Sequence, residues 1–405
     1  MFPKTPADAT HLTLPDTMTR SFGLDRQHVL YQAGALPEAD RTVVAYQHLR
    51  ERARDVMTRK AFDYLDGGAG GGSTMNANRM AFDRWRIVPR MLRGVTRPDL
   101  SVEVLGDRLP FPVILAPIGV QGSMHAEGEL ATARAAATLG IPITLSTVSS
   151  RPMEPVADIM GSVPHWFQLY WSKNHEFVVS LLGRAQAAGF STLVVTVDTT
   201  QIGWRDRDLE NAYLPFLQGE GLGNYLSDPV FTAALEQQPD ENQRAAVEYF
   251  TSIFHRTDLT WDDLAFLRQH WTGPIVLKGI LHADDARLAR DHGMDGVIVS
   301  NHGGRQVDGA VGALDTLPGV VDAVGEDIAV LFDSGIRGGA DAFKALALGA
   351  QAVFLGRPYA FGLALGGEHG VRDVIHNLLA ELDMITALAG CASREEITGD
   401  LLVSA

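Results

Sequence analysis

The chain of 405 residues is 46% hydrophobic, which is enough to bury a large core in one or two domains. Its 49 acidic residues outnumber its 34 basic residues, and the formal net charge of −15 argues against nucleic acid or an anionic membrane as a partner. The one cysteine, Cys391, cannot form a disulfide within the chain or build a cysteine metal site, so we expect no metal.

Residues 1–110 are expected to form an N-terminal helical cap, with a turn at the glycine cluster 67–72. The first 20 residues contain no apolar segment of signal-peptide length, so we expect a cytoplasmic protein. The most hydrophobic stretch, 110–120, contains prolines and is too short to cross a bilayer. It therefore indicates a buried strand and no membrane anchor.

Eight short apolar runs rich in β-branched residues follow in chain order. Each precedes a segment of helical character, and this alternation is typical of a parallel sheet. Eight such units predict an α/β protein with a closed (β/α)8 TIM barrel over residues 111–405. A doubly wound open sheet is the alternative, but it often carries a GxGxxG fingerprint, which follows none of these runs. The runs span residues 112–120, 143–149, 165–170, 192–199, 274–280, 296–304, 329–337 and 352–358.

The fourth unit differs from the others because an insertion at about 204–260 separates its strand from its helix. Connections of this length are usually functional or disordered. We therefore predict that the insertion is a lid over the barrel.

Reactive residues gather where the apolar runs end, and the C-terminal ends of the strands form the active site in this fold. The seventh and eighth runs place glycines and two arginines where barrels commonly bind phosphate, which favours a phosphorylated cofactor or substrate. The residues at the eight ends are Gly119, Ser146, Gln168 with Tyr170, Thr196 with Asp198, Lys278, Ser300 with His302 and Arg305, Asp333 with Arg337, and Gly356 with Arg357.

The segment SNHGGRQVDG supplies a candidate base, His302, and a guanidinium, Arg305. A second guanidinium, that of Arg205, follows the fourth strand. The paired N–H donors of each guanidinium match the geometry of a carboxylate, so both could bind the same one. Asp198 is placed to accept a hydrogen bond from His302 and to stabilise its imidazolium form. Lys278 has two interpretations, a Schiff-base nucleophile as in barrel aldolases or a fixed positive charge beside a cofactor ring.

These motifs together resemble the FMN-dependent L-2-hydroxy acid oxidising family over residues 60–400. SNHGGRQVDGA is accompanied in order by APIG, FQLY, VTVD, LKGI, DSGIRGGAD and GRP. The resemblance implies that FMN is the cofactor and that the chain forms a homotetramer or homo-octamer. One departure is that Gly71 and Gly72 stand where many relatives place acidic residues.

The resemblance also implies a role for each site residue. Arg205, Arg305 and Tyr64 would bind the substrate carboxylate, Tyr170 its hydroxyl, and His302 its proton. Lys278 would place positive charge beside flavin N1. The residues around the isoalloxazine and ribityl parts of FMN would be Pro117, Ile118, Gly119, Ser146, Gln168, Thr196, Lys278 and Ser300. Those along the ribityl chain and phosphate would be Asp333, Ser334, Gly335, Arg337, Gly356 and Arg357.

Within the family, the insertion segments GWRDRDL, PFLQG and NYLSDPVF resemble the lid of the lactate 2-monooxygenases. Gly119 would leave room beside the flavin. We therefore expect L-lactate and O2 as substrates, with caged pyruvate decarboxylated to acetate, CO2 and water. The alternatives are an oxidase that releases keto acid and H2O2, a hydroxy acid dehydrogenase and, more remotely, a Schiff-base aldolase.

Overall fold

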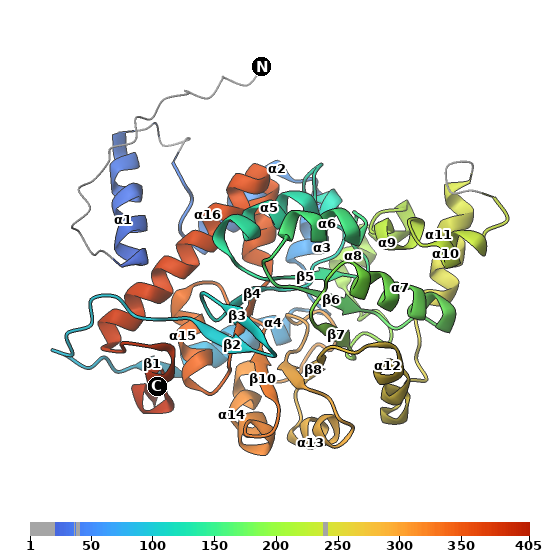
Figure 1. Ribbon diagram of the computed structural model, residues 1–405. Coiled ribbons are helices and arrows are strands. Elements are labelled where there is room, and N and C mark those ends of the chain that lie inside the picture. Colours follow the sequence, from blue (N-terminus) through green and yellow to red (C-terminus); the bar gives the residue numbers. More distant parts are fainter. Residues whose placement is uncertain (1–20, 36, 38–40, 238–241) are drawn as a thin grey trace.

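The computed structural model describes residues 21–35, 37, 41–237 and 242–405, so the expectation for residues 1–20 lies outside it. Eight parallel strands close into one barrel in sequential order (Figure 1), which confirms the predicted (β/α)8 architecture. All eight expected runs form strands. They are β4 (Val113–Leu115), β5 (Ile143–Ser146), β6 (His165–Leu169), β7 (Leu193–Thr196), β8 (Ile275–Ile280), β9 (Gly296–Val299), β10 (Ala329–Phe332) and β11 (Val353–Leu355).

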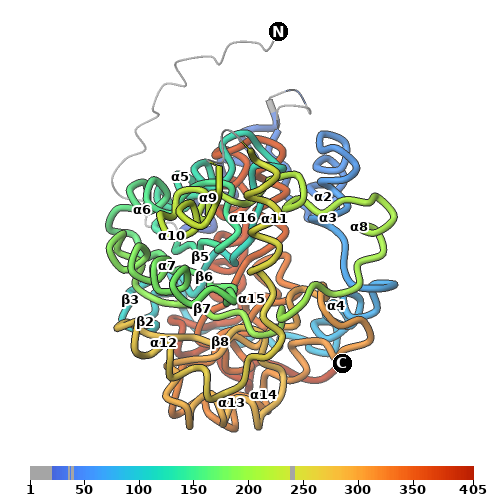
Figure 2. The backbone as a smooth tube through the Cα atoms, turned by 90° about the vertical axis from the view of Figure 1, so that its right-hand side faces the viewer, coloured from blue at the N-terminus to red at the C-terminus, as the bar shows by residue number. Residues whose placement is uncertain are grey.

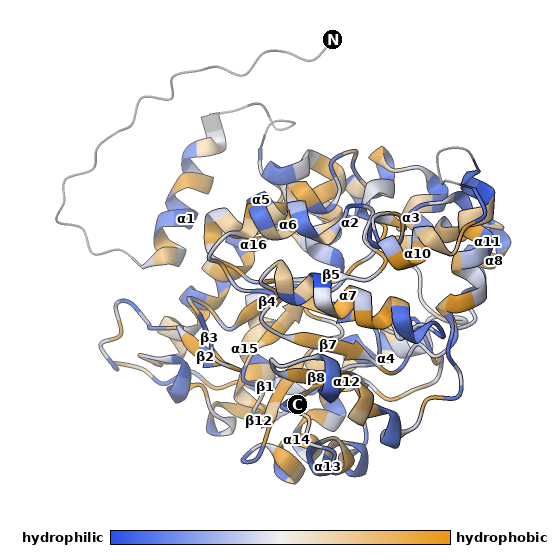
Figure 3. Ribbon diagram, turned by 45° about the vertical axis from the view of Figure 1, so that its right-hand side comes forward, coloured by the Kyte–Doolittle hydropathy of each residue, from blue (hydrophilic) through white to orange (hydrophobic). Residues whose placement is uncertain are grey.

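A helix follows each barrel strand and packs on the outside of the barrel. Figure 3 shows the hydrophobic strands enclosed by helices whose outer faces carry the hydrophilic residues. None of the helices in the described parts of the chain is long and apolar enough to span a bilayer. The eight helices are α5 (Glu129–Leu139), α6 (Met153–Met160), α7 (His175–Ala187), α12 (Leu264–His270), α13 (Ala283–Asp291), α14 (Ala313–Val324), α15 (Gly339–Ala347) and α16 (Arg357–Ala389), the last broken at Gly366 and Gly367.

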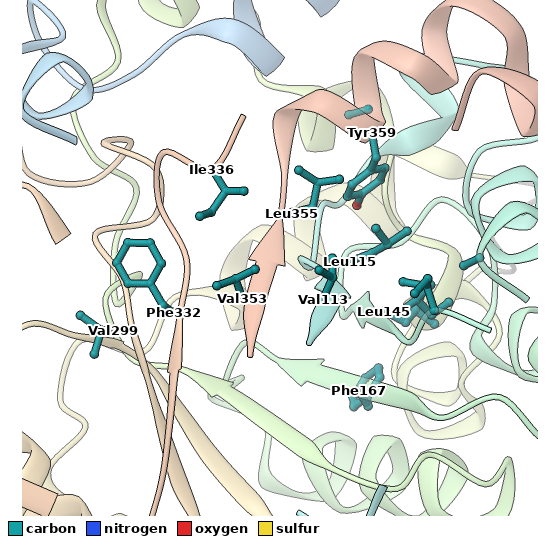
Figure 4. Close-up of a cluster of buried hydrophobic side chains, with 14 of the residues drawn as sticks. Val113, Leu115, Leu145, Phe167, Val299, Phe332, Ile336, Val353, Leu355 and Tyr359 are labelled. Atoms are coloured by element: carbon teal, nitrogen blue, oxygen red, sulfur yellow. The ribbon is translucent and has the colours of Figure 1, made fainter. Parts of the chain in front are cut away.

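Side chains alternate between the two faces of each strand, as the two-residue period of a strand requires. On β4 and β11, Val113, Leu115, Val353 and Leu355 belong to the core between strands and helices (Figure 4). A second, separate apolar cluster takes one residue from each of seven strands and fills the barrel. Its strand members are Ile114, Trp166, Val194, Val276, Ile298, Leu331 and Phe354.

The N-terminal end of the barrel is closed by a hairpin that the sequence did not predict, formed by β2 (Val102–Val104) and β3 (Asp107–Leu109). Val104 and Leu109 join the cluster inside the barrel. The indole nitrogen of Trp166 donates a hydrogen bond of 2.7 Å to Asp107. The barrel is therefore a packed core at this end, and its open end is the C-terminal one.

The rest of the N-terminal region is mostly helical, as expected, but it also contains a short strand. That strand, β1 (Trp85–Ile87), pairs with β12 (Leu402–Ser404) near the other end of the chain. The helices are α1 (Phe22–Gln32), α2 (Tyr46–Val56), α3 (Arg59–Asp66) and α4 (Ser73–Asp83).

The insertion after β7 is folded rather than an open loop. It contains α8 (Asp206–Glu210), α9 (Gly223–Leu226), α10 (Pro229–Ala233) and α11 (Gln243–Phe254), and α10 packs against α7 (Figures 1 and 2). Buried Asn224 donates hydrogen bonds to the carbonyl oxygens of Ser146 and Thr147 at the end of β5. This anchor joins the insertion to the rim of the barrel.

Candidate active site

A layer of seven residues, six of them polar, lies directly above the apolar cluster inside the barrel. Each member stands two positions after an inward-facing residue, so the strand period points it to the same interior. Gln168 accepts a hydrogen bond from Ser146 at 3.0 Å and donates one to Thr196 at 3.0 Å. The layer comprises Ser146, Gln168, Thr196, Lys278, Ser300, Asp333 and Gly356. These are seven of the residues that the sequence placed at the strand ends.

Lys278 is the cation of this layer. Its buried ammonium group lies 3.0 Å from the carboxylate of Asp333 and donates to Ser300 at 3.0 Å. Burial alone would lower the pKa of Lys278, but the negative charges of Asp333 and Asp198 raise it above its ordinary value. A Schiff-base nucleophile must lose its proton, so these charges favour the fixed positive charge over the aldolase interpretation.

His302 lies in a tight loop after β9 that only a strained backbone can form. His302, Gly303 and Gly304 have φ values of 57°, 65° and 76°, in the left-handed region that a side chain seldom adopts. Hydrogen bonds hold the loop: His302 N–H donates to Ser300 Oγ, and Gly303 N–H donates to Ser334 Oγ. The loop thereby turns the imidazole towards the cavity.

Asp198 fixes the imidazole of His302. His302 Nδ1 lies 2.9 Å from Asp198 Oδ1, which places the proton on Nδ1 and leaves Nε2 free to accept one. Burial lowers the pKa of His302, and Lys278 lowers it further, against the opposing charge of Asp198. Burial would raise the pKa of Asp198, but its interactions with His302 and with the charge of Lys278 lower that pKa below its ordinary value. A neutral histidine and an ionised aspartate are the resting states of a general base and its partner.

Arg205 and Arg305 both line the cavity beside His302, as predicted. Arg305 donates to the carbonyl oxygens of Tyr64 and Gly67, and its guanidinium lies over the Tyr64 ring, 4.9 Å from the centroid. Burial and the nearby charge of Arg205 lower the pKa of Arg305 to about 9. Two buried like charges in contact with one cavity attract an anion.

The opposite end of the cavity lies at β10 and β11, where Arg337 and Arg357 differ in their contacts. The three donor nitrogens of Arg357 bond to the carbonyl oxygens of Leu65, Gly67 and Gly303. The Arg337 guanidinium lies over the ring of Tyr46, 4.5 Å from its centroid, and has no carboxylate or hydrogen-bond partner among the described residues. Burial lowers the pKa of both guanidinium groups. Arg337 is the one that is free to bind an anion.

One elongated cavity connects these groups and holds about 1320 Å³ of empty space, its open mouth included. Five other predicted residues are not among the described residues that line it: Ser146, Gln168, Thr196, Asp198 and Ser300. The predicted residues that line it are Tyr64, Pro117, Ile118, Gly119, Tyr170, Arg205, Lys278, His302, Arg305, Asp333, Ser334, Gly335, Arg337, Gly356 and Arg357.

Several cavity residues were not predicted. Thr199 and Ile202 follow β7, Tyr46 comes from α2, and Phe216 and Phe254 come from the insertion. Thr199 stands inside the VDTT segment beside Asp198, so its position at a strand end was a usable signal. The two phenylalanines carried no such signal, because the path of a long insertion cannot be read from its sequence.

The packing around Gly119 differs from the expectation that this glycine leaves room beside the flavin. A Cβ atom at this position would lie 2.5 Å from Val148 Cγ2 and 2.8 Å from the Val148 carbonyl oxygen. The space that the glycine leaves is therefore filled by Val148. Close packing of two loops explains this glycine, and it leaves no extra room in the cavity.

A closed parallel barrel with a buried lysine and a histidine–aspartate pair at its strand ends has the arrangement of a barrel enzyme. Residues 53–404 match the model of the FMN-dependent dehydrogenases. The chain is 47% identical over 367 residues to the FMN-dependent alpha-hydroxy acid dehydrogenase of Penicillium citrinum, covering 87% of this chain and 91% of the relative. It is 45% identical over 360 residues to the L-lactate oxidase of Lysinibacillus sphaericus, covering 89% and 92%.

A solved structure of mandelate oxidase with (S)-4-hydroxymandelic acid has the same fold, with a TM-score of 0.79 and 39% identity over 90% of this chain and 99% of that one. The chain therefore belongs to the FMN-dependent 2-hydroxy acid oxidase and dehydrogenase family. Its cofactor is FMN.

The cavity fits this cofactor in two respects. The buried ammonium of Lys278 lies at its base, where an electron-rich ring gains from a fixed positive charge. At the far end, the guanidinium of Arg337, which lies over the Tyr46 ring and has no carboxylate partner among the described residues, stands beside Gly335, whose φ of 101° only glycine adopts readily. A guanidinium beside an exposed backbone is suited to a phosphate group.

Proposed function

We propose that this protein oxidises a small L-2-hydroxy acid with dioxygen, and that L-lactate is its substrate. The observation that carries the proposal is His302, paired with Asp198 and placed in one cavity with Arg205 and Arg305. A base beside two guanidinium groups suits a substrate that carries both a carboxylate and an adjacent C–H and O–H group. The similarity to an L-lactate oxidase supports lactate and dioxygen.

Three groups orient the substrate in this proposal. Arg205 and Arg305 bind its carboxylate, with Tyr64 beside them. Tyr170, whose pKa burial raises, stays protonated and donates a hydrogen bond to the substrate hydroxyl oxygen. The carboxylate and hydroxyl contacts together direct the substrate towards His302 Nε2.

His302 then removes a proton at Nε2, because Nδ1 is held by Asp198. The ionised carboxylate of Asp198 stabilises the imidazolium that results. Bound FMN supplies the acceptor for the two electrons. Lys278 would hold positive charge beside its ring, supported by the layer of Ser146, Gln168, Thr196 and Ser300.

The remaining contacts of FMN in this proposal come from three segments. Pro117, Ile118 and Gly119 would contact the ring from the loop after β4. The residues after β10 and β11 would hold the ribityl chain and phosphate, with Arg337 as the principal cation. They are Asp333, Ser334, Gly335, Arg337, Gly356 and Arg357.

Oxidative decarboxylation of the keto acid by the H2O2 formed from dioxygen, before either product leaves the cavity, is the second candidate function. The observation that favours it is the folded insertion, which contributes Phe216 and Phe254 to the cavity wall. A wall of this kind excludes water and retains the product. Gly119 no longer supports this outcome, because Val148 fills the adjacent space.

The test is aerobic turnover of L-lactate by the FMN-loaded enzyme, with pyruvate, peroxide and acetate measured together. Pyruvate with an equal amount of peroxide is the expected result and rules out decarboxylation. Acetate without free peroxide establishes the second candidate instead. Turnover that requires an artificial electron acceptor contradicts the use of dioxygen. In a His302→Gln control, FMN stays bound but anaerobic L-lactate no longer reduces it.

A further inference from the structure

Thr199 makes a short contact with the histidine–aspartate pair that the mechanism above does not use. Its hydroxyl donates to Asp198 Oδ1 at 2.8 Å and lies 3.3 Å from His302 Nδ1. The imidazole Nδ1 contacts the same carboxylate oxygen at 2.9 Å. Two donors therefore share one oxygen atom of Asp198.

The other carboxylate oxygen, Asp198 Oδ2, has no hydrogen-bond partner among the described residues, although it is buried. It faces the backbone of Gly279, where a Cβ atom would lie 2.9 Å from it. All the hydrogen bonding that stabilises the negative charge of Asp198 thus reaches Oδ1, and Thr199 supplies half of it. A donor to a carboxylate disperses its charge and lowers its proton affinity.

Other charged and titratable groups also act on this pair from neighbouring elements. Lys278 on β8 opposes protonation of His302, and Arg205 after β7 acts in the same direction. Tyr170 after β6 faces Asp198. Asp333 after β10 acts through its ion pair with Lys278. Thr199 differs from all of these because it is uncharged and shares an atom with the histidine's own hydrogen bond.

We propose that Thr199 is a positioning residue that limits the basicity of His302 by donating a hydrogen bond to Asp198. This inference rests on the proposed function of His302 as the base. Without the hydroxyl, the full charge of Oδ1 acts on the imidazole, so His302 holds its proton more tightly.

The matched variants are Thr199→Val, which keeps the branched shape and loses the hydroxyl, and Thr199→Ser, which keeps the hydroxyl. The valine variant moves the acidic limb of kcat/KM for L-lactate to higher pH by about half a unit to one unit, because His302 must be neutral to act. The serine variant keeps the limb of the parent enzyme. Thr199→Ala is the second hydroxyl-free variant if the valine protein does not fold.

A direct titration of His302 separates this inference from the proposed function. Histidine labelled with ¹³C is incorporated into the FMN-loaded protein, and the His302 signal is identified by its loss in His302→Gln. The same upward shift of the His302 pKa is expected in the valine variant, whether or not L-lactate is the substrate. In an Asp198→Asn background the shift disappears, since the carboxylate that carries it is gone.

An unchanged His302 pKa in both hydroxyl-free variants overturns the inference, even if their turnover falls, because a purely structural role lowers the rate without moving the titration. A downward shift overturns it as well. Failure to oxidise L-lactate with a normal upward shift contradicts the proposed function and leaves the role of Thr199 standing.

Discussion

Asp198 and burial shift the pKa of His302 in opposite directions. Its charge raises the His302 pKa, whereas burial and Lys278 lower it below the ordinary value. The base is therefore neutral through the neutral pH range, and its activity falls only when the pH drops through the lowered pKa. Removal of the Asp198 charge leaves the lowering influences alone, so the His302 pKa falls further.

Asp198→Asn accordingly weakens the base and destabilises the imidazolium. We expect kcat to fall by about 10² to 10⁴ and the residual acidic limb to move to lower pH. The measurement is the pH profile of kcat and kcat/KM. Asp258→Asn is the matched control, because that carboxylate is exposed on the insertion and its one ion pair among the described residues is with Arg256. An acidic limb that moves upward in Asp198→Asn would contradict this account of the pair.

The strand ends show why much of the site was predictable at the residue scale. Gln168, Lys278 and Ser300 follow apolar runs whose two-residue period fixes the face on which each side chain lies. The contacts made by those side chains were less predictable. Arg357 donates hydrogen bonds to three carbonyl oxygens, two of which lie at the end of α3. The position of that helix end depends on packing between distant parts of the chain.

Among the elements, the side chain of Gln306 adds four hydrogen bonds within and between the loops after β7 and β9. Its amide nitrogen donates to the carbonyl oxygens of Asp198 and Gln201, and its amide oxygen accepts from Arg205 and from Gly203 N–H. Gly203 is a close-contact position, because a Cβ there would lie 2.5 Å from the Gln306 carbonyl oxygen. The sequence placed Gln306 beside Arg305 but could not show that it spans two loops about a hundred residues apart.

Gln306→Leu removes all four of these hydrogen bonds while keeping a similar volume. We expect KM for L-lactate to rise about tenfold to a hundredfold, since Arg205 loses a partner that orients it. The kcat value should change less, and FMN affinity should not change, because Gln306 does not line the cavity. Steady-state kinetics and FMN titration provide the measurements. A fall in kcat at unchanged KM would show that Gln306 acts through Asp198 instead.

At the scale of the whole molecule, the barrel and its eight helices followed from the sequence, whereas the hairpin that closes it did not. The turn between β2 and β3 has φ values of 53° at Leu105 and 87° at Gly106. Hairpin turns with two positive φ values usually contain Asn-Gly or Asp-Gly, which makes them recognisable in a sequence. Leucine in the first position removes that signal, and three-residue strands are too short to show an alternating pattern.

Trp166 couples this hairpin to the barrel, so Trp166→Phe tests how much the closure stabilises the molecule. The phenyl ring leaves part of the indole volume empty and removes the hydrogen bond to Asp107, whose Oδ2 keeps the hydrogen bond from Ser191. We expect a loss of about 2–4 kcal/mol in the free energy of unfolding and a lower Tm at saturating FMN. The kcat/KM value should stay unchanged, because the site lies at the other end of the strands.

Trp204→Phe is the control, since Trp204 is 74% exposed and its loss should leave Tm unchanged. Equal Tm values for the two variants would mean that the hairpin covers the barrel without stabilising it.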